Sequence, residues 1–442
     1  MKDCKKLNCF EKGLVCVPVS KFPRVVVVGG GFAGINLIKA MKKMPVQIVL
    51  FDKNNFHQFL PLLYQVATSG IEPDSIIFPY RKMFRKYKNI IYRMAEVTKV
   101  NPENKTISTS IGDISYDFLV IATGSKTDYF GNKDSEKFGI GLKSITQALD
   151  IRSLLLQNLE EAVLRCIGHD KATLSSVMIV GGGAAGVEMA GALAEFKRYI
   201  LPMDYPELEL TRVKIILVEG SNRLLQSMPE KLSGKTYHYL NNMGVDIRLN
   251  TLVKNYSHNK VEFANGETLN VAALIWTAGV KGKIITGIGK ERISKQQRII
   301  VDEYNKVEGL DRVFAIGDIA FMKTDGYPDG HPMVAQVAIQ QGKNLATNIF
   351  SSIKDKSLRK FKYTDKGSMA TIGKKKAVAY IKHFSVWGFT AWFLWSFVHL
   401  MSIMGVRNKT LVGLNWMWSY FTYDKGDRVI IRSRPKFDNK HT

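Results

Sequence analysis

The sequence predicts an α/β protein with two parallel-sheet domains and an apolar, helical C-terminal region. Two glycine-rich loops, one starting at Gly29 and the other at Gly181, each follow an apolar strand pattern and precede a helical pattern. A third feature is the stretch at residues 387–406, which contains no Lys, Arg, Asp or Glu. At 442 residues the chain is long enough for two or three domains of ordinary size.

The first glycine-rich loop has the spacing of a dinucleotide-binding strand–loop–helix unit. Its glycines form the pattern G-x-G-x-x-G at Gly29, Gly31 and Gly34, after a β-branched strand at residues 25–28. The first glycine permits a tight turn, the second lets the backbone approach a pyrophosphate, and the third lets the helix pack closely on the strand. Asp52 ends the next predicted strand, where an acidic residue is expected to bind ribose hydroxyls.

The same device is repeated in the middle of the chain. Its glycines are Gly181, Gly183 and Gly186, and Glu219 ends the strand that follows. Glu219 lies farther along the chain than this pattern usually requires, and an insertion at residues 197–212 explains the difference. A carboxylate at that strand end accepts a hydrogen bond from a 2′-hydroxyl and repels a 2′-phosphate, so we expect NADH to be preferred over NADPH.

A further apolar strand follows each copy and ends in small residues. The first ends in Ala-Thr-Gly and the second in Thr-Ala-Gly, and we expect each strand to return to its own nucleotide site. The residues that this pattern places at the two sites are Thr123, Gly124, Ala278 and Gly279.

A later strand ends at Gly317 and Asp318. A short acidic side chain at this position suits the hydroxyls of a flavin's ribityl chain. An ordinary turn aspartate is the alternative interpretation.

Taken together, these motifs resemble those of the two-dinucleotide-binding-domain flavoproteins, in which one Rossmann domain holds FAD and an inserted one holds NAD(P)H. The resemblance covers about residues 22–350. Within that superfamily the sequence is most similar to the type II (alternative) NADH dehydrogenases, which pass two electrons from NADH through FAD to a membrane quinone without pumping protons. That likeness rests on residues 54–73, on an A-Q-x-A-x-Q motif at residues 335–340, and on the apolar, aromatic C-terminus.

The resemblance implies catalytic roles for three residues. Gln336 and Gln340 belong to the family's quinone-site motif, and their i, i+4 spacing places both amides on one helix face, where they can donate hydrogen bonds to a quinone carbonyl. Glu188 matches a family glutamate near the nicotinamide that could orient the ring or help to move protons. The alternatives are solvent-exposed glutamines on an amphipathic helix and a helix-capping or salt-bridged Glu188.

The resemblance also implies a division of the chain into five parts. The NADH-binding domain is inserted in the FAD-binding domain, and a membrane-binding region follows. The predicted parts are an N-terminal tail (1–21), the first FAD-binding part (22–145), the NADH-binding domain (146–290), the second FAD-binding part (291–360) and the membrane-binding region (361–442).

We expect the C-terminal region to lie in the membrane surface, on the cytoplasmic face of the inner or plasma membrane. Its two apolar segments are 387–406 and 411–423. Trp392 and Trp395 stand near the middle of the first segment, whereas a spanning helix carries tryptophan near its ends. Basic residues on both sides suit acidic lipid headgroups. A single span, a buried core helix and a homodimer interface are the alternatives.

Composition and cysteine usage limit the other function classes. The formal net charge of +24 indicates an anionic partner, but no nucleic-acid-binding motif is recognisable and we expect no nucleic acid and no metal cluster. Disulfide reductases and sulfide:quinone oxidoreductases need a redox-active cysteine pair, whereas Cys166 has no partner cysteine in the predicted domains. A ferredoxin-type NAD(P)H reductase and a membrane-tethered NADH-binding redox sensor stay open as alternatives.

Overall fold

The computed structural model describes residues 13–164, 176–422 and 426–430. Cys4, Cys9 and Cys166 lie outside these described residues.

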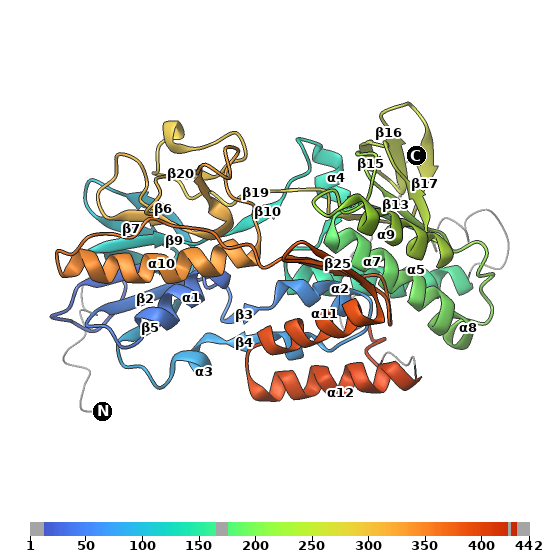
Figure 1. Cartoon of the computed structure of the whole chain (residues 1–442), viewed down its shortest axis with the longest axis horizontal. Coiled ribbons are helices and arrows are strands. Elements are labelled where there is room, and N and C mark those ends of the chain that lie inside the picture. The colour runs from blue at the N-terminus through green and yellow to red at the C-terminus, as the bar shows by residue number, and fades with distance from the viewer. Residues whose placement is uncertain (1–12, 165–175, 423–425, 431–442) are drawn as a thin grey trace. The chain divides into compact units, whose positions relative to one another are not determined.

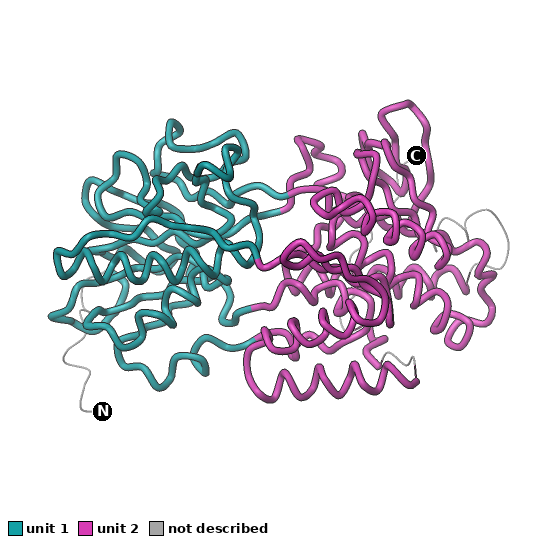
Figure 2. Tube along the Cα trace, in the orientation of Figure 1, with its two compact units in different colours: residues 1–57, 78–126, 280–365 teal, residues 58–77, 127–279, 366–442 magenta. Residues whose placement is uncertain are grey.

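The chain forms two compact units, and both are discontinuous in sequence (Figure 2). Unit 1 comprises residues 1–57, 78–126 and 280–365, and unit 2 comprises residues 58–77, 127–279 and 366–442. Each unit is organised around its own parallel sheet, which confirms the predicted α/β class with two Rossmann-type sheets. The five functional parts expected from the resemblance stay a prediction.

Unit 1 is built on a five-stranded parallel sheet (Figure 1). Its central strands are almost wholly buried because helices and loops cover both faces, as is typical of parallel sheets. In spatial order the strands are β21 (Val313–Ala315), β9 (Phe118–Ile121), β1 (Arg24–Val28), β2 (Gln47–Asp52) and β5 (Ile90–Met94).

Two helices of unit 1 lie directly against each other, α1 (Phe32–Met41) and α10 (Ala335–Ile353). Gly342 of α10 faces the backbone of α1, where a side-chain carbon would crowd the Ala33 carbonyl oxygen. The small residues of α10 therefore permit an unusually close helix contact. The remaining elements of unit 1 are β6 (Val97–Asn101), β7 (Thr106–Thr109), β8 (Gly112–Ser115), β19 (Val280–Gly282), β20 (Ile299–Val301), β22 (Ala320–Met322) and α3 (Tyr80–Phe84).

Unit 2 repeats the plan of unit 1. Its parallel sheet again places the strand before the glycine-rich loop at the centre. In spatial order the strands are β11 (Ile140–Gly141), β18 (Ala273–Trp276), β12 (Val177–Val180), β13 (Ile215–Val218) and β14 (Asp246–Arg248). The helices are α2 (Leu63–Ala67), α4 (Lys133–Phe138), α5 (Ile145–Leu164), α7 (Ala184–Glu195), α8 (Leu201–Asp204) and α9 (Glu230–Asn242). Short strands β3 (Phe56–Gln58), β4 (Ile77–Pro79) and β10 (Ser125–Thr127) stand where the chain passes between units.

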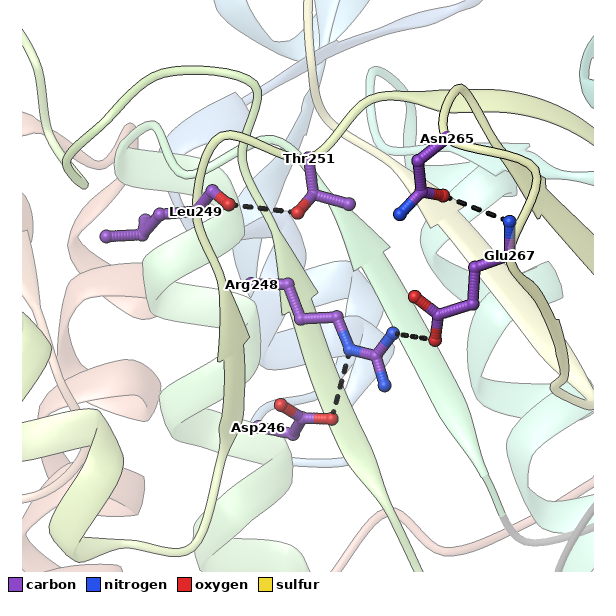
Figure 3. A network of polar contacts seen from close by, with 6 residues as sticks. All are labelled: Asp246, Arg248, Leu249, Thr251, Asn265 and Glu267. Atoms are coloured by element: carbon purple, nitrogen blue, oxygen red, sulfur yellow. Dashed lines mark hydrogen bonds and ion pairs between the residues drawn. The ribbon is translucent and has the colours of Figure 1, made fainter.

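A small antiparallel sheet borders the edge strand β14; its strands are β15 (Val253–Ser257), β16 (Lys260–Phe263) and β17 (Thr268–Asn270). Figure 3 shows Arg248, the last residue of β14, between two carboxylates. Its guanidinium lies 3.3 Å from Asp246 and 2.9 Å from Glu267, and it also stacks on the Phe263 ring. One arginine thus ties the small sheet to the edge of the large one.

The C-terminal part of unit 2 consists of three antiparallel strands and two helices. The strands are β23 (Ser368–Thr371), β24 (Ala377–Ile381) and β25 (Phe384–Gly388), and the helices are α11 (Phe389–Ser402) and α12 (Val406–Thr422). The two helices lie side by side (Figure 1), with ring centroids 5.4 Å apart for Trp395 and Trp416.

The charge-free stretch at 387–406 is therefore not one helix. Its first two residues end β25, α11 takes up fourteen residues, and α12 begins after a bend at Gly405. Fourteen helical residues extend about 21 Å, less than the roughly 30 Å of a bilayer's hydrocarbon core. Among the described residues, no helix is both long enough and apolar enough to cross a membrane.

Candidate active site

The first glycine-rich loop adopts a conformation that only glycine tolerates at two of its positions. Gly29 has a φ of +103°, and a side-chain carbon there would overlap the Ala122 carbonyl group. At Gly34 such a carbon would overlap the Gly29 carbonyl oxygen. Gly31, in contrast, faces open space, with no atom within 4 Å of the position its side chain would take.

This loop leaves the start of α1 available to an anionic group. The N-cap is Gly31, so no side chain caps the helix, and the first turn contains no acidic residue. Backbone N–H groups and the positive end of the helix dipole favour a phosphate at such a position. The open space beside Gly31 and this uncapped helix start fit the pyrophosphate of FAD.

Asp52 lies where the sequence predicts it, but its carboxylate already holds the loop. One oxygen accepts a hydrogen bond from the Gly30 N–H at 2.7 Å, and the other accepts one from the Asn54 N–H at 2.8 Å. The Tyr80 hydroxyl donates to the Gly30 carbonyl oxygen at 2.9 Å, and burial raises the pKa of that tyrosine. Asp52 therefore holds the glycine-rich loop in its conformation, and ribose binding by its remaining lone pairs stays a prediction.

The second glycine-rich loop has the same geometry. Gly181 has a φ of +109°, and a side-chain carbon at Gly186 would overlap the Gly181 carbonyl oxygen. Gly183 faces open space at the uncapped start of α7. Glu219 accepts hydrogen bonds from the Gly182 N–H at 2.6 Å and from the Ser221 N–H at 2.8 Å, at the same relative positions as Asp52 in unit 1.

The strands that return to the two loops bring the small residues expected of them. In unit 1, the Thr123 hydroxyl donates to the Lys283 carbonyl oxygen at 2.7 Å, and Gly124 has a φ of +71° with open space beside it. In unit 2, Ala278 lies against Gly181, and Gly279 has a φ of +156°. Each set lies at the carboxyl end of its sheet, where parallel α/β sheets bind ligands.

Gly317 and Asp318 follow β21 at the same end of the unit 1 sheet. The Gly317 N–H donates to Gln341 Oε1 at 2.7 Å, and a positive φ of +75° brings this glycine close to α1 and α10. Asp318 Oδ2 accepts a hydrogen bond from the Ser125 hydroxyl at 2.6 Å. Arg298, almost fully buried, donates to the Asp318 carbonyl oxygen at 3.1 Å and holds this turn in place.

The two glutamines of the α10 motif have different surroundings. The Gln340 amide makes two hydrogen bonds with the backbone of Thr364, one from its NH₂ group at 2.9 Å and one to its oxygen at 3.0 Å. Gln336 is half-buried in the first turn of α10. Gln340 thus secures the extended segment after α10, and the quinone role of both glutamines stays a prediction.

Glu188 of α7 is buried beneath the C-terminal strands. Its carboxylate accepts a hydrogen bond from the Thr371 N–H at 3.3 Å. Burial raises the pKa of Glu188 to about 8, although the Thr371 N–H and the Trp395 indole oppose part of the rise. At neutral pH this carboxyl group is mostly protonated, which suits a residue that holds or moves a proton.

A cavity within unit 2 is lined by Thr371 and Trp395, which both interact with Glu188, and its empty space, including its open mouth, is about 640 Å³. Trp392, Trp395, Trp416 and Tyr420 contribute aromatic walls from α11 and α12. The Trp395 indole in this wall interacts with the Glu188 carboxylate, whereas Ser396 Oγ is buried and has no hydrogen-bond partner among the described residues. A buried hydroxyl without a partner in an aromatic cavity indicates a ligand that can accept a hydrogen bond.

A network of side chains surrounds this cavity. The Tyr64 hydroxyl lies 3.0 Å from Thr371 Oγ1 and accepts a hydrogen bond from the Gln65 amide at 2.9 Å. Trp416 Nε1 donates to Gln65 Oε1 at 2.8 Å. Sequence reasoning missed this network and also Gln341, because only burial and long-range contacts distinguish these residues from ordinary polar positions.

His57 supports the first glycine-rich loop. Its Nδ1 lies 3.0 Å from the Gly30 carbonyl oxygen, and burial lowers the pKa of the ring to about 4. A neutral ring whose Nδ1–H donates to that carbonyl supports the glycine-rich loop.

Comparisons with known proteins agree with this geometry. Residues 23–342 match the family described as pyridine nucleotide-disulphide oxidoreductase, and residues 366–422 match the NDH2 C-terminal domain. A type II NADH:quinone oxidoreductase of Mycobacterium tuberculosis is 32% identical over 426 residues, which cover 92% of this chain and 90% of the relative. A type II NADH:quinone oxidoreductase of Haemophilus influenzae is 30% identical over 381 residues, which cover 79% and 84% respectively.

Solved structures show the same fold. NDH2 from Plasmodium falciparum, determined in complex with NADH, superposes with a TM-score of 0.84 at 20% identity and covers 93% of this chain and 100% of its own. The sulfide:quinone oxidoreductase from Aquifex aeolicus superposes with a TM-score of 0.70 at 19% identity and covers 88% and 92%. Likeness at this level of identity concerns the fold alone.

The two glycine-rich loops should respond separately to substitution. Gly34→Ala forces a methyl group into the Gly29 carbonyl oxygen, so the purified variant should lose the visible absorbance of its flavin. Gly186→Ala creates the equivalent overlap with the Gly181 carbonyl oxygen, so it should retain flavin and weaken NADH binding by about tenfold or more. The absorbance spectrum and an NADH titration measure the two effects, and loss of flavin from both variants would contradict the assignment.

Glu188 should make stability depend on pH in a defined direction. The native state keeps a proton that the unfolded state releases, so this group lowers the free energy of unfolding as pH rises from about 4.5 to about 8. Glu188→Gln removes that dependence while keeping an acceptor for the Thr371 N–H. Relative to wild type, the variant should therefore gain stability between pH 5 and pH 9, by on the order of a few kcal/mol.

Denaturant titrations at both pH values measure this gain. Glu230→Gln, at an exposed glutamate on α9, is the matched control and should show no such change. An equal stability difference at pH 5 and pH 9 for Glu188→Gln would refute a raised pKa.

Proposed function

Because the chain belongs to the pyridine nucleotide-disulphide oxidoreductases and, within them, to the type II NADH:quinone oxidoreductases, we propose that it oxidises NADH and reduces a membrane quinone through bound FAD. The observation that carries the proposal is the aromatic cavity of unit 2, where Ser396 Oγ has no partner among the described residues and the Trp395 indole interacts with Glu188, whose pKa is raised. A quinone offers two carbonyl oxygens, which are acceptors only, on a flat apolar ring. The alternatives of a ferredoxin reductase and a redox sensor explain neither these donors nor the aromatic walls.

In this proposal, the residues around the two loops bind different dinucleotides. FAD, when bound, accepts two electrons from NADH and passes them to the quinone. In unit 1 the FAD contacts are Gly29, Gly31, Gly34, Asp52, Thr123, Gly124, Gly317 and Asp318. In unit 2 the NADH contacts are Gly181, Gly183, Gly186, Glu219, Ala278 and Gly279.

In this proposal, Trp395 and Ser396 donate hydrogen bonds to a quinone carbonyl oxygen in the cavity of unit 2. These donors stabilise the negative charge that develops on that oxygen as the quinone is reduced. Glu188 holds one of the two protons that the product hydroquinone needs, since its raised pKa keeps it protonated near neutral pH. Gln336 and Gln340 are retained as candidate quinone contacts on α10, on the strength of the family motif.

The outer faces of α11 and α12 support attachment to a membrane surface. On α11 four exposed apolar side chains recur at every fourth residue, Phe389, Phe393, Phe397 and Met401, and Val398 is exposed beside them. On α12 they follow the i, i+3, i+4, i+7 pattern: Leu414, Met417, Trp418 and Phe421. Both helices thus point aromatic side chains outward, and we propose that these stripes insert into the interfacial region of the cytoplasmic face, with nearby lysines on acidic headgroups.

The quinone half-reaction should depend on the indole N–H of Trp395. Trp395→Phe keeps an aromatic side chain but removes the donor, so reoxidation of reduced flavin by quinone should slow by about tenfold or more. Stopped-flow absorbance follows this step after anaerobic bleaching with NADH, and bleaching itself should keep its wild-type rate. Trp387→Phe, on β25 outside the cavity, is the matched control.

Gln336→Leu tests the α10 motif in the same assay. Slowing of quinone reduction alone supports a quinone contact, whereas equal slowing of both half-reactions assigns this residue to flavin positioning. If Trp395→Phe leaves quinone reduction unchanged, the cavity of unit 2 is not the quinone site.

Membrane attachment should weaken when the exposed stripes lose their aromatic side chains. The double variant Phe397→Gln and Trp418→Gln should float less with vesicles that contain acidic lipid, because two exposed aromatic rings no longer enter the interface. Met203→Gln, at an exposed apolar position on α8, should float like wild type. If the double variant floats normally but sediments as a smaller species, the stripes form a homodimer interface instead.

A further inference from the structure

Unit 2 contains a second cavity, distinct from the proposed quinone cavity. Of its described lining residues, only Thr68 also lines the quinone cavity. The empty space of the second cavity, counted together with its opening to solvent, is about 560 Å³. Most of its wall is aliphatic and comes from α5, α7, α8 and the sheet; the apolar lining residues are Ala67, Leu155, Leu156, Leu159, Val177, Leu193, Phe196, Leu201, Val213 and Ile215.

Two cationic side chains interrupt this apolar wall, together with Thr68, Ser69 and Asn158. Among the described residues, no acidic side chain lines the cavity. Arg152 is only 3% exposed, and its Nε has no hydrogen-bond partner among the described residues. Lys197 donates through Nζ to the Val213 carbonyl oxygen at 2.6 Å, and burial lowers the pKa of this amine. A buried guanidinium with an unused N–H is costly unless an anion or another acceptor completes it.

The present partner of Arg152 occupies only part of the guanidinium. Asp427, from the segment after α12, lies 2.9 Å from Nη1 and is 28% exposed at its side chain. The following residue, Arg428, pairs with Asp204 at 2.6 Å, which holds this segment on α8. Arg152 lines the cavity and Asp427 does not, and Arg152 Nε is buried with no hydrogen-bond partner among the described residues.

The backbone beside the cavity is also irregular. Phe196 and Lys197 begin a π-helical turn, Phe196–Ile200, directly after α7. Such turns occur frequently at functional sites because they displace side chains from the regular helix face. Here the turn contributes one apolar and one cationic side chain to the same cavity.

We propose that this cavity binds an aliphatic monocarboxylate, such as a medium-chain fatty acid. Its hydrocarbon chain fills the aliphatic part of the cavity, and its carboxylate accepts hydrogen bonds from Arg152. A planar carboxylate suits the planar guanidinium, which prefers two parallel N–H···O contacts. The ligand and Asp427 therefore compete for the same cation. This inference is independent of the proposed function, since it concerns binding and needs no turnover.

Calorimetric titration of the full-length protein in detergent with octanoate tests the proposal. We expect one saturable site for octanoate. Octanol has the same chain length without the charge, and its affinity should be lower by about tenfold or more. Leu155→Trp should abolish octanoate binding by filling the cavity. Leu154→Trp, the neighbouring half-buried leucine outside the cavity lining, should bind like wild type.

Two charge variants test the role of Arg152. Arg152→Gln should weaken octanoate binding by about tenfold or more, whereas Asp427→Asn should strengthen it because it removes the competing carboxylate. Lower stability of Arg152→Gln would by itself also weaken its octanoate binding. Loss of stability cannot explain tighter binding by Asp427→Asn, so this second variant tests the proposal independently. Equal affinity for octanoate and octanol, wild-type binding by Leu155→Trp, or weaker binding by Asp427→Asn would each overturn the proposal.

Discussion

The structure depends on one steric constraint that occurs twice: the start of a helix lies directly on the glycine-rich loop that precedes it. At Gly34 and at Gly186 no room exists for a side-chain carbon, because the carbonyl oxygen of the first loop glycine occupies its place. This contact brings the helix N-terminus to the carboxyl end of each sheet, beside Gly31 and Gly183, which face open space. The binding surface for each dinucleotide therefore follows from backbone packing rather than from charged side chains.

The acidic residue of each loop acts first on the protein itself. Asp52 and Glu219 each accept two backbone N–H groups, one from the middle of the glycine loop and one from two residues beyond the acid. Charge-assisted hydrogen bonds of this kind are stronger than neutral ones, so they hold the loop open before any cofactor arrives. The same two contacts recur in both units, although a long insertion precedes Glu219. The position of the carboxylate is set by the end of its strand and not by its distance along the chain from the glycines.

The C-terminal part combines two features that conflict in a water-soluble domain. It buries polar groups at its inner side, where Thr371, Trp395 and Ser396 lie near Glu188 of α7, and it exposes aromatic side chains at its outer side. Burying an ionisable carboxyl group keeps it neutral near pH 7, and exposing apolar rings requires an apolar neighbour. A membrane-bound quinone and the lipid that dissolves it satisfy both requirements at once, which is the physical basis of the proposed function.

The sequence by itself determined the two glycine loops, their acids, the returning strands and the family, because each depends on residues close together in the chain whose order mirrors a strand–loop–helix unit. It also indicated that Trp392 and Trp395 stand too near the middle of their segment for a spanning helix. Only the tertiary structure decided that Gln340 binds the Thr364 backbone, that Glu188 lies under β23, and that Arg152 faces an apolar cavity. These outcomes depend on the burial of individual side chains and on contacts with residues far away in sequence. Neither feature produces a periodic or local pattern that could be recognised in the sequence.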